Sequence, residues 1–311
     1  MAKILITESV HPIGPELLTA AGHTVVYADR DMDIIRREIV HADAVLVRII
    51  ELPGSLLTTA KNLKIVSKHG VGYDNIDLDY CKSHGIAVTI TPNANSLSVA
   101  EHAFTLMLTL AKNIIPVSNE YRTVGFAAKN HTPGIEMTGK TLGLIGMGRI
   151  GKYVLHMCKD GLDMHVIVYD PYISEVPEGV EKVDDLSELL RRADVVTLHC
   201  LLTDETRKLI DRERLALMKP TALLINCARG PIVDEAALIE ALENGRLAGA
   251  GLDVTDPEPV APDSLLFKLP NVIVTPHYAP TTVESATRVS KIAAENINAV
   301  LAGQEPVGRI V

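Results

Sequence analysis

The sequence is poor in several residue types, and each shortage argues against a class of protein. Its 311 residues include no tryptophan, 3 phenylalanines and 4 cysteines. The 30 Lys and Arg are outnumbered by 39 Asp and Glu, a formal net charge of -9, so no basic surplus exists to neutralise nucleic-acid phosphates. No apolar run approaches the ~20 residues that a membrane-spanning helix needs. We therefore expect no nucleic-acid partner and no membrane insertion.

The few cysteines also limit the possible sites. No two of them lie at C-x-x-C spacing, and all have apolar neighbours; they are Cys81, Cys158, Cys200 and Cys227. This pattern indicates reduced, buried thiols rather than a disulfide framework or a metal site.

The first residues run straight into a strand-like segment without the long apolar region and cleavage site of a signal peptide, which predicts a cytoplasmic protein.

Hydrophobic residues, in contrast, make up 47% of the chain and occur in short runs. A chain of this length exceeds the size at which one hydrophobic core usually stops growing, so two domains are expected. In the first third, β-rich runs alternate with helix-like segments. The expected strands are Ile4–Thr7, Thr24–Tyr27, Ala44–Val47, Ile65–Ser67 and Ile86–Thr89. This alternation predicts a parallel sheet covered by helices on both faces.

The pattern changes at a long helix expected over Ser98–Lys112, which is followed by an apparently irregular stretch, Asn113–Thr138. A second series then begins, with strands expected at Thr141–Ile145, His165–Tyr169, Val195–Leu198, Ala222–Asn226, Gly249–Asp253 and Val272–Thr275. The last helix, Thr282–Ala302, comes too late to extend this sheet and is expected to pack on the first domain. The sequence thus predicts an α/β protein with two Rossmann-like, doubly wound parallel-sheet domains and a cleft between them. The expected boundaries are 1–96 with 284–311 for a first, discontinuous domain and 97–283 for a second domain.

A dinucleotide-binding fingerprint opens the second series. Gly146, Gly148 and Gly151 form a G-x-G-x-x-G that follows a strand and begins a helix, and the next strand ends at Asp170. The glycines permit a tight turn, close approach of the pyrophosphate and close helix packing, while the helix N-terminus supplies amide donors. The carboxylate of Asp170 is expected to bind the ribose hydroxyls and to repel a 2′-phosphate. The pattern therefore predicts NAD rather than NADP as the cofactor.

Three charged or titratable residues follow later strands of the same series. Because the carboxyl ends of parallel strands meet at one edge of a sheet, Arg229, Glu258 and His277 are expected to lie together there. Arginine offers a bidentate fork for a carboxylate, histidine exchanges a proton near neutral pH, and glutamate orients the histidine ring. Taken singly, each has an ordinary structural interpretation. Taken together beside a dinucleotide site, they favour catalysis on a hydroxy acid.

These residues belong to motifs that run along nearly the whole chain. The matching segments are Lys68–Asp77, Thr91–Glu101, Gly146–Gly151, Asn226–Gly230 and the loops around Glu258 and His277. Through them the sequence resembles the NAD-dependent D-isomer 2-hydroxyacid dehydrogenases, and is most similar to the phosphoglycerate dehydrogenase branch. The regulatory C-terminal domain of many members of that branch is expected to be absent, because the chain ends at Val311.

The resemblance implies roles for individual residues. His277 is the implied acid/base, Glu258 its partner, and Arg229 the ligand of the substrate carboxylate and carbonyl oxygen. Backbone amides of the substrate site are implied at Gly70, Val71 and Gly72. The implied cofactor-binding residues beyond the glycines and Asp170 are Arg149 and Ile150 at the pyrophosphate, Cys200 at the adenosine, Asp253 at the nicotinamide carboxamide, and Cys227 and Ala228. The resemblance also implies a homodimer formed through the long helix and the stretch that follows it.

The substrate stays open at this point. Arg48 and Lys68 follow or end strands of the first domain and can bind a second anionic group such as a phosphate, or can be ordinary surface charges. The substrate is therefore 3-phosphoglycerate, hydroxypyruvate or glyoxylate, or another short 2-keto acid. Lys68, Leu201 and Tyr278 depart from the usual family pattern. A second function also remains possible, that of an NAD(H)-sensing binding protein with little turnover, similar to a co-repressor.

Overall fold

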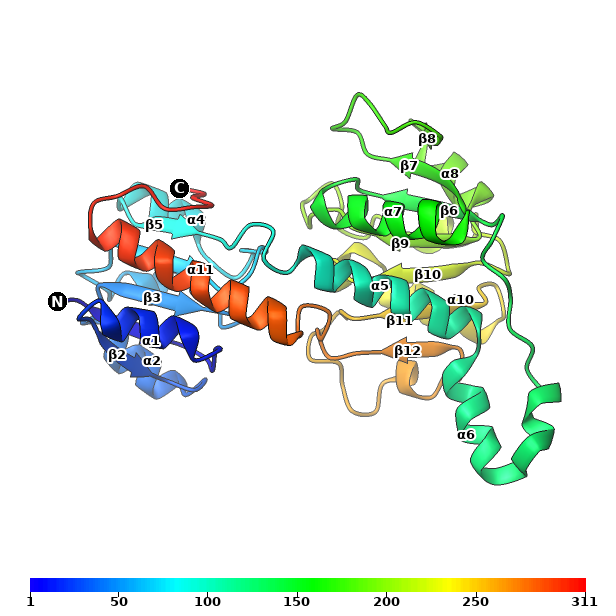
Figure 1. The fold of residues 1–311 in the computed structure, drawn as a ribbon, viewed down its shortest axis with the longest axis horizontal. Helices are drawn as coiled ribbons and strands as arrows, with labels where there is room; N and C mark the ends of the chain where they lie inside the picture. Colours follow the sequence, from blue (N-terminus) through cyan, green and yellow to red (C-terminus); the bar gives the residue numbers. More distant parts are fainter. The chain divides into compact units, whose positions relative to one another are not determined.

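The computed structural model describes residues 1–311 and divides the chain into two compact units. One unit consists of Met1–Asn95 and Pro280–Val311, and the other of Ser96–Ala279. Each contains one parallel sheet with helices packed against it (Figure 1). The predicted α/β class with two parallel sheets is confirmed, whereas the cleft expected between the domains stays a prediction. None of the helices combines the length and the apolar character that a membrane span requires.

The first unit contains a five-stranded sheet in the order β2-β1-β3-β4-β5. Its strands are β1 (Lys3–Ile6), β2 (Thr24–Tyr27), β3 (Ala44–Val47), β4 (Ile65–Lys68) and β5 (Ala87–Thr89). Its helices are α1 (Ile13–Ala20), α2 (Met32–Ile39), α3 (Gly54–Leu57), α4 (Leu78–Ser83) and α11 (Val283–Leu301). The strand order reverses between β1 and β3, which is where an open α/β sheet usually binds its ligand.

Successive residues of these strands point to opposite faces, and both faces are covered. On one face, Leu5 and Val45 pack against Ile35 of α2. On the other, Ile4 and Leu46 pack with residues of α1 and α11. This burial on both sides explains why the strands are continuous apolar runs rather than alternating ones.

Helix α11 comes last in the sequence but belongs to the first unit. Thr282 caps its N-terminus by accepting a hydrogen bond from Ser285 N, and Ala293 and Ile297 are fully buried against the sheet. The hydroxyl of Ser67 in β4 donates to the carbonyl oxygen of Ala293 at 3.0 Å. The first unit is therefore assembled from two separate segments of the chain.

The second unit contains a seven-stranded sheet in the order β12-β11-β10-β9-β6-β7-β8. Its strands are β6 (Thr141–Ile145), β7 (His165–Tyr169), β8 (Val180–Lys182), β9 (Val195–Leu198), β10 (Leu223–Asn226), β11 (Gly249–Leu252) and β12 (Val272–Val274). Its α-helices are α5 (Ser96–Ala111), α6 (Ile114–Val124), α7 (Arg149–Leu162), α8 (Leu186–Arg192), α9 (Arg212–Leu215) and α10 (Glu235–Glu243). Three 3₁₀ turns complete it, η1 (Gly125–Asn130), η2 (Gly230–Ile232) and η3 (Leu265–Phe267). Here the order reverses between β6 and β9.

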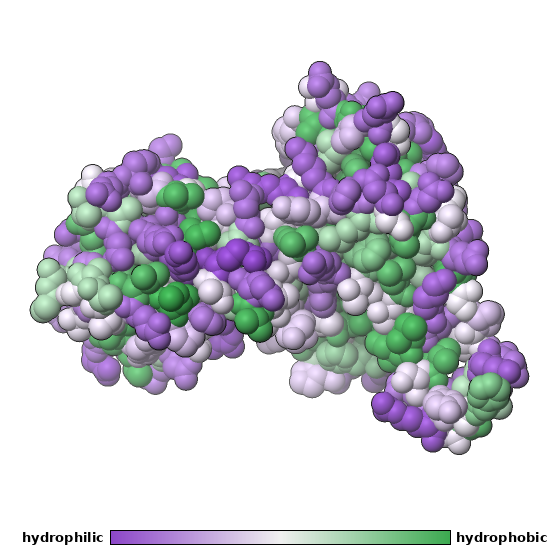
Figure 2. Space-filling view, in the orientation of Figure 1, coloured by the Kyte–Doolittle hydropathy of each residue, from purple (hydrophilic) through white to green (hydrophobic).

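The expectation of an irregular stretch at Asn113–Thr138 is wrong, because its first half is helical. Helix α6 and turn η1 extend from the second unit (Figure 1), and no residue of α6 is buried. A helix that buries no face lacks the apolar periodicity by which a helix is recognised in a sequence. Its exposed side chains are nevertheless apolar in part; they include Ile114, Ile115, Tyr121, Val124 and Phe126 of η1. Figure 2 shows apolar residues on this extension.

The cysteines match the expectation of free thiols with one difference. Cys81, Cys158 and Cys227 are buried, whereas Cys200 is half-buried. No group of three or more His, Cys, Asp or Glu side chains is placed to hold a metal ion.

Candidate active site

The glycine-rich turn lies between β6 and α7 and requires its glycines. Gly146 has a φ of +89°, and a Cβ atom on it would lie 2.7 Å from the backbone nitrogen of Cys200. A Cβ on Gly151 would lie 2.3 Å from the carbonyl oxygen of Gly146. Gly148 stands immediately before α7 in an extended conformation and is exposed, with open space around it. The turn therefore leaves the backbone amides at the start of α7 accessible to an anionic group.

Asp170 directly follows β7 and supports this turn. Its Oδ2 accepts a hydrogen bond from Met147 N at 2.9 Å, and its Oδ1 accepts one from Tyr172 N at 3.0 Å. Arg149 and Ile150 are the first residues of α7. The carboxylate thus lies beside the glycine-rich turn, where the sequence pattern predicted it.

Two thiols lie at the carboxyl ends of the neighbouring strands. Cys200 follows β9, and burial raises the pKa of its thiol to about 11. Cys227 follows β10, and burial raises the pKa of this thiol well above its ordinary value. Burial therefore favours the neutral thiol form of both residues near neutral pH.

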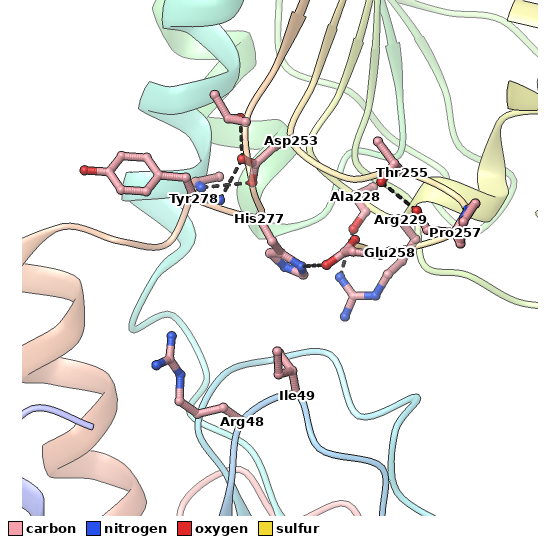
Figure 3. A network of polar contacts seen from close by, with 12 residues as sticks. Arg48, Ile49, Ala228, Arg229, Asp253, Thr255, Pro257, Glu258, His277 and Tyr278 are labelled. Carbon is pink, nitrogen blue, oxygen red and sulfur yellow. Dashed lines mark hydrogen bonds and ion pairs between the residues drawn. The ribbon is translucent and has the colours of Figure 1, made fainter. Parts of the chain in front are cut away.

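The three predicted catalytic residues follow adjacent strands of the same sheet. Arg229 comes after β10, Glu258 after β11 and His277 after β12, and these strands are hydrogen-bonded neighbours. The Nδ1 atom of His277 lies 2.6 Å from Oε1 of Glu258, and both side chains are partly exposed, at 33% and 39% (Figure 3). The contact with the glutamate therefore involves only the Nδ1 side of the imidazole ring, and Nε2 takes no part in it.

The loop that carries Arg229 is shaped by side-chain contacts and by one close approach. Asn226 at the end of β10 accepts a hydrogen bond from Ala228 N at 3.0 Å and donates one to the carbonyl oxygen of Arg229 at 2.9 Å. A Cβ on Gly230 would lie 1.9 Å from the carbonyl oxygen of Thr255, so only glycine fits there. These contacts bring the loop after β10 against the loop that leads to Glu258.

Asp253 has a role that the sequence did not reveal. Its side chain is 1% exposed, and its two oxygens accept hydrogen bonds from Tyr278 N at 2.7 Å and Ala279 N at 2.9 Å. It therefore holds the loop that follows His277. The position of Asp253 directly after β11, the neighbour of β12, was the available signal, but the amides that it binds could not be read from the sequence.

The remaining predicted residues lie at the carboxyl edge of the five-stranded sheet, in the first unit. Lys68 ends β4 and is 8% exposed, with its ammonium donating to the carbonyl oxygen of Arg48 and, at 2.6 Å, to Oδ1 of Asn75. The alternative of an ordinary surface charge is therefore wrong for Lys68. Gly70, with a φ of +144°, begins the predicted Gly70–Gly72 segment, and its carbonyl oxygen accepts from Thr91 N at 2.9 Å.

A buried carboxylate, missed at the sequence level, organises the same edge. Glu8 is 2% exposed and accepts hydrogen bonds from three consecutive backbone amides, those of Arg48 at 2.7 Å, Ile49 at 2.8 Å and Ile50 at 3.2 Å. Next to Lys68, burial and the positive charge of Arg48 lower the pKa of His69 to about 3, so this imidazole is neutral. The available signal for Glu8 was its place just after an expected strand; in the structure it lies two residues after β1, which borders the reversal of strand order.

Comparisons with known proteins show which family the sequence matches. Residues 104–279 match the family model of the NAD binding domain of D-isomer specific 2-hydroxyacid dehydrogenases. The D-3-phosphoglycerate dehydrogenase of Methanocaldococcus jannaschii is 42% identical over 308 residues, 98% of this chain but 58% of that protein. The chain thus spans little more than half the length of this relative. The glyoxylate reductase of Thermofilum pendens is 37% identical over 319 residues, covering 98% of this chain and 93% of that protein.

A solved structure extends the match to the whole fold. The crystal structure of the TT0316 protein from Thermus thermophilus superposes with a TM-score of 0.91 at 35% identity, covering 99% of this chain and 100% of that one. The sequence match to the family model covers more than half of the chain. The protein belongs to the D-isomer specific 2-hydroxyacid dehydrogenase family, whose NAD(P)-binding domain it carries.

Proposed function

We propose that the protein is an oxidoreductase that interconverts a small D-2-hydroxy acid and the corresponding 2-keto acid with NAD(H), using His277 as the acid/base. The observation that carries the proposal is the pair of His277 and Glu258, 2.6 Å apart, on the sheet edge that also bears the glycine-rich turn. A histidine held by a carboxylate is suited to proton transfer near neutral pH.

The residues of the glycine-rich turn fit an NAD(H) cofactor. The turn from Gly146 to Gly151 has no room for side chains at its first and last glycines, and it presents a helix N-terminus. We propose that this turn, with Arg149 and Ile150, holds the pyrophosphate. Further contacts are proposed for Asp170 with the ribose hydroxyls, Cys200 with the adenosine, Asp253 with the nicotinamide carboxamide, and for Cys227 and Ala228. NAD(H) bound there supplies or accepts the hydride.

The side chains of this chain perform the remaining steps. During reduction, negative charge develops on the carbonyl oxygen of the keto acid. The guanidinium of Arg229 stabilises that charge and orients the substrate carboxylate through its planar fork. His277 donates the proton from Nε2 while Glu258 stabilises the ring in its orientation, and the reverse transfer occurs during oxidation.

The substrate class is proposed from the first unit and from the relatives. Arg48 and the Gly70, Val71 and Gly72 amides are proposed to bind substrate anionic groups, whereas the ammonium of Lys68 is engaged by Arg48 and Asn75 and supports this surface. The named relatives act on 3-phosphoglycerate or glyoxylate according to their names. We propose short 2-keto acids as the substrate class. The candidates are hydroxypyruvate, glyoxylate and the phosphorylated keto acid that corresponds to 3-phosphoglycerate.

We further propose that NAD(H) is preferred over NADP(H) and that the protein forms a homodimer. The carboxylate of Asp170 beside the glycine-rich turn supports the first proposal. A relative from Sinorhizobium meliloti, 28% identical, is named as an NADPH-dependent glyoxylate/hydroxypyruvate reductase, so the preference needs its own measurement. The exposed apolar residues of α6 and η1 support the second proposal.

The proposed function is tested by NADH oxidation with a panel of glyoxylate, hydroxypyruvate and 3-phosphohydroxypyruvate. We expect turnover of at least one acid by the natural chain and a loss of about 10²–10⁴-fold in kcat for His277→Asn, with NADH affinity retained. Tight NADH binding without turnover of any acid would support the NAD(H)-sensing function instead. Near-normal kcat in His277→Asn would remove His277 from the chemistry.

A further inference from the structure

The backbone at His277 has a conformation that other groups must hold in place. His277 has a φ of +52°, in the left-handed region, which is unfavourable for a residue other than glycine. The backbone nitrogen of His277 donates to the carbonyl oxygen of Asp253 at 2.8 Å, and the next two amides donate to the Asp253 carboxylate. The position of the imidazole therefore depends on how firmly Asp253 and the strand end are fixed.

The hydrogen atoms available to Thr275 and Asp253 determine which neighbouring group must donate a hydrogen bond to Thr275. The hydroxyl of Thr275 lies 2.5 Å from Oδ1 of Asp253 and 3.0 Å from Nε2 of His102. The buried carboxylate, already bound by two amides, accepts the single hydroxyl hydrogen of Thr275. Thr275 Oγ1 must then act as acceptor toward His102, so Nε2 of His102 carries a hydrogen and donates it.

His102 contacts the loop on both sides of His277. Besides the hydroxyl of Thr275, its ring lies edge-on to the ring of Tyr278, with centroids 6.1 Å apart and an interplanar angle of 61°. Its Nε2 is also 3.5 Å from Oδ1 of Asp253, and its side chain is only 17% exposed. His102 lies in α5, a 16-residue helix packed on the sheet, so it joins the loop to a rigid element (Figure 3 shows Asp253, His277 and Tyr278).

We infer that His102 is a positioning residue for His277, acting as a hydrogen-bond donor to Thr275 and thereby fixing the strand end and the loop 275–279. This inference rests on the proposed function, because it assigns His277 the proton transfer. His102 does not touch the reacting atoms. Its contribution is geometric, and misplacement of a catalytic group by about 1 Å can cost on the order of 10²-fold in rate.

The test compares a substitution that removes the donor with one that keeps it. His102→Leu fills similar space without a donor, and we expect kcat to fall about 10- to 100-fold while the NADH dissociation constant changes less than about twofold. His102→Gln can place an N–H near the Nε2 position and is expected to recover kcat to within about threefold of the natural chain. His156→Leu, an exposed histidine of α7, is the matched control and should leave kcat unchanged.

A second pair of variants keeps the test decisive if His102→Leu does not fold. Thr275→Val removes the hydroxyl and should lower kcat as His102→Leu does, while Thr275→Ser should retain it. Equal losses in His102→Leu and His102→Gln would overturn the inference, because packing rather than the donor would then matter. So would an unchanged kcat in His102→Leu together with a large loss in His277→Asn. Normal activity in His277→Asn would instead refute the proposed function.

Discussion

Replacement of Glu8 by glutamine tests how a single buried carboxylate organises the first unit. Oε2 of Glu8 accepts from Arg48 N and from the hydroxyl of Thr7 at 2.7 Å, and Oε1 accepts from the next two amides. A glutamine side chain has one oxygen and one NH₂ group. Either orientation therefore turns NH₂ hydrogens toward at least one backbone N–H, which then loses its acceptor.

The size of the effect follows from that geometry. The loss of one hydrogen bond to a charged acceptor costs about 1.5–3 kcal/mol, and a buried donor left unpaired costs about 1–3 kcal/mol. These two costs overlap in part, so they are not simply added. The more favourable orientation places NH₂ beside Thr7, whose hydroxyl can turn to accept from it and to donate to the carbonyl oxygen of Leu46 at 3.2 Å. Only Arg48 N is then unpaired, so Glu8→Gln should destabilise the first unit by about 2–4 kcal/mol.

Thermal unfolding followed by circular dichroism measures this loss. At about 2–4 °C per kcal/mol, the midpoint of the affected transition should fall by about 4–16 °C. Glu51→Gln is the matched control, since Glu51 is exposed in the same loop region, and its midpoint should stay within about 1 °C. The KM for the keto acid should rise severalfold in Glu8→Gln, because the backbone amide of Arg48, a proposed substrate ligand, loses its hydrogen bond to Glu8. Equal midpoints for the two variants would refute the reasoning.

Four other outcomes are expected. Arg229→Lys keeps the charge but loses the planar fork, so steady-state kinetics should show a higher KM for the keto acid and a lower kcat; unchanged constants would remove Arg229 from the site. The carboxylate of Asp170 should make kcat/KM for NADH at least about tenfold higher than for NADPH, a ratio that Asp170→Ala should reduce; equal use of the two cofactors would contradict this. Light scattering should give a dimer, and Phe126→Lys should weaken it; a monomer at micromolar concentration would exclude the proposed contact. Burial lowers the pKa of His199 to about 3, so the folded protein keeps this ring neutral while the unfolded chain protonates it below about pH 6.5. Stability should therefore fall by about 1.4 kcal/mol per pH unit on acidification from about pH 6.5 toward 3 on account of this residue, and His199→Asn should lessen the decline of the unfolding midpoint between pH 7 and 5.

The strands were predictable because burial on both faces leaves little freedom in their composition. Runs such as Ala44–Val47 are apolar at every position, and the structure contains strands at these places. Helix α6 was not predictable by the same reasoning, since none of its residues is buried within the chain. Strand β8 was also missed, because its three residues, Val180–Lys182, include a glutamate and a lysine. Elements without a buried face leave only a weak pattern in the sequence.

Topology explains why part of the candidate site was predictable. The rule that parallel strands end at one edge predicted a common sheet edge for Arg229, Glu258 and His277, and the three residues follow neighbouring strands. His102 lies in a helix, far from these loops in the sequence, and its contact with Thr275 depends on how α5 packs on the sheet. That packing is set by long-range contacts, which no local motif encodes.

The structure uses one arrangement three times, in two different sheets. Glu8 follows β1 and binds amides of the loop after the neighbouring strand β3. Asp170 follows β7 and binds an amide of the turn after the neighbouring strand β6. Asp253 follows β11 and binds amides of the loop after the neighbouring strand β12.

In each case the acid lies one strand away from the loop that carries a proposed functional group. A carboxylate suits this position because it offers only acceptors, whereas the amide of asparagine or glutamine presents donors toward N–H groups. An acidic residue directly after a buried strand is therefore evidence for a loop anchor as much as for a ligand contact. For Asp170 and Asp253 both roles must be compatible, so their replacement should disturb loop geometry as well as charge.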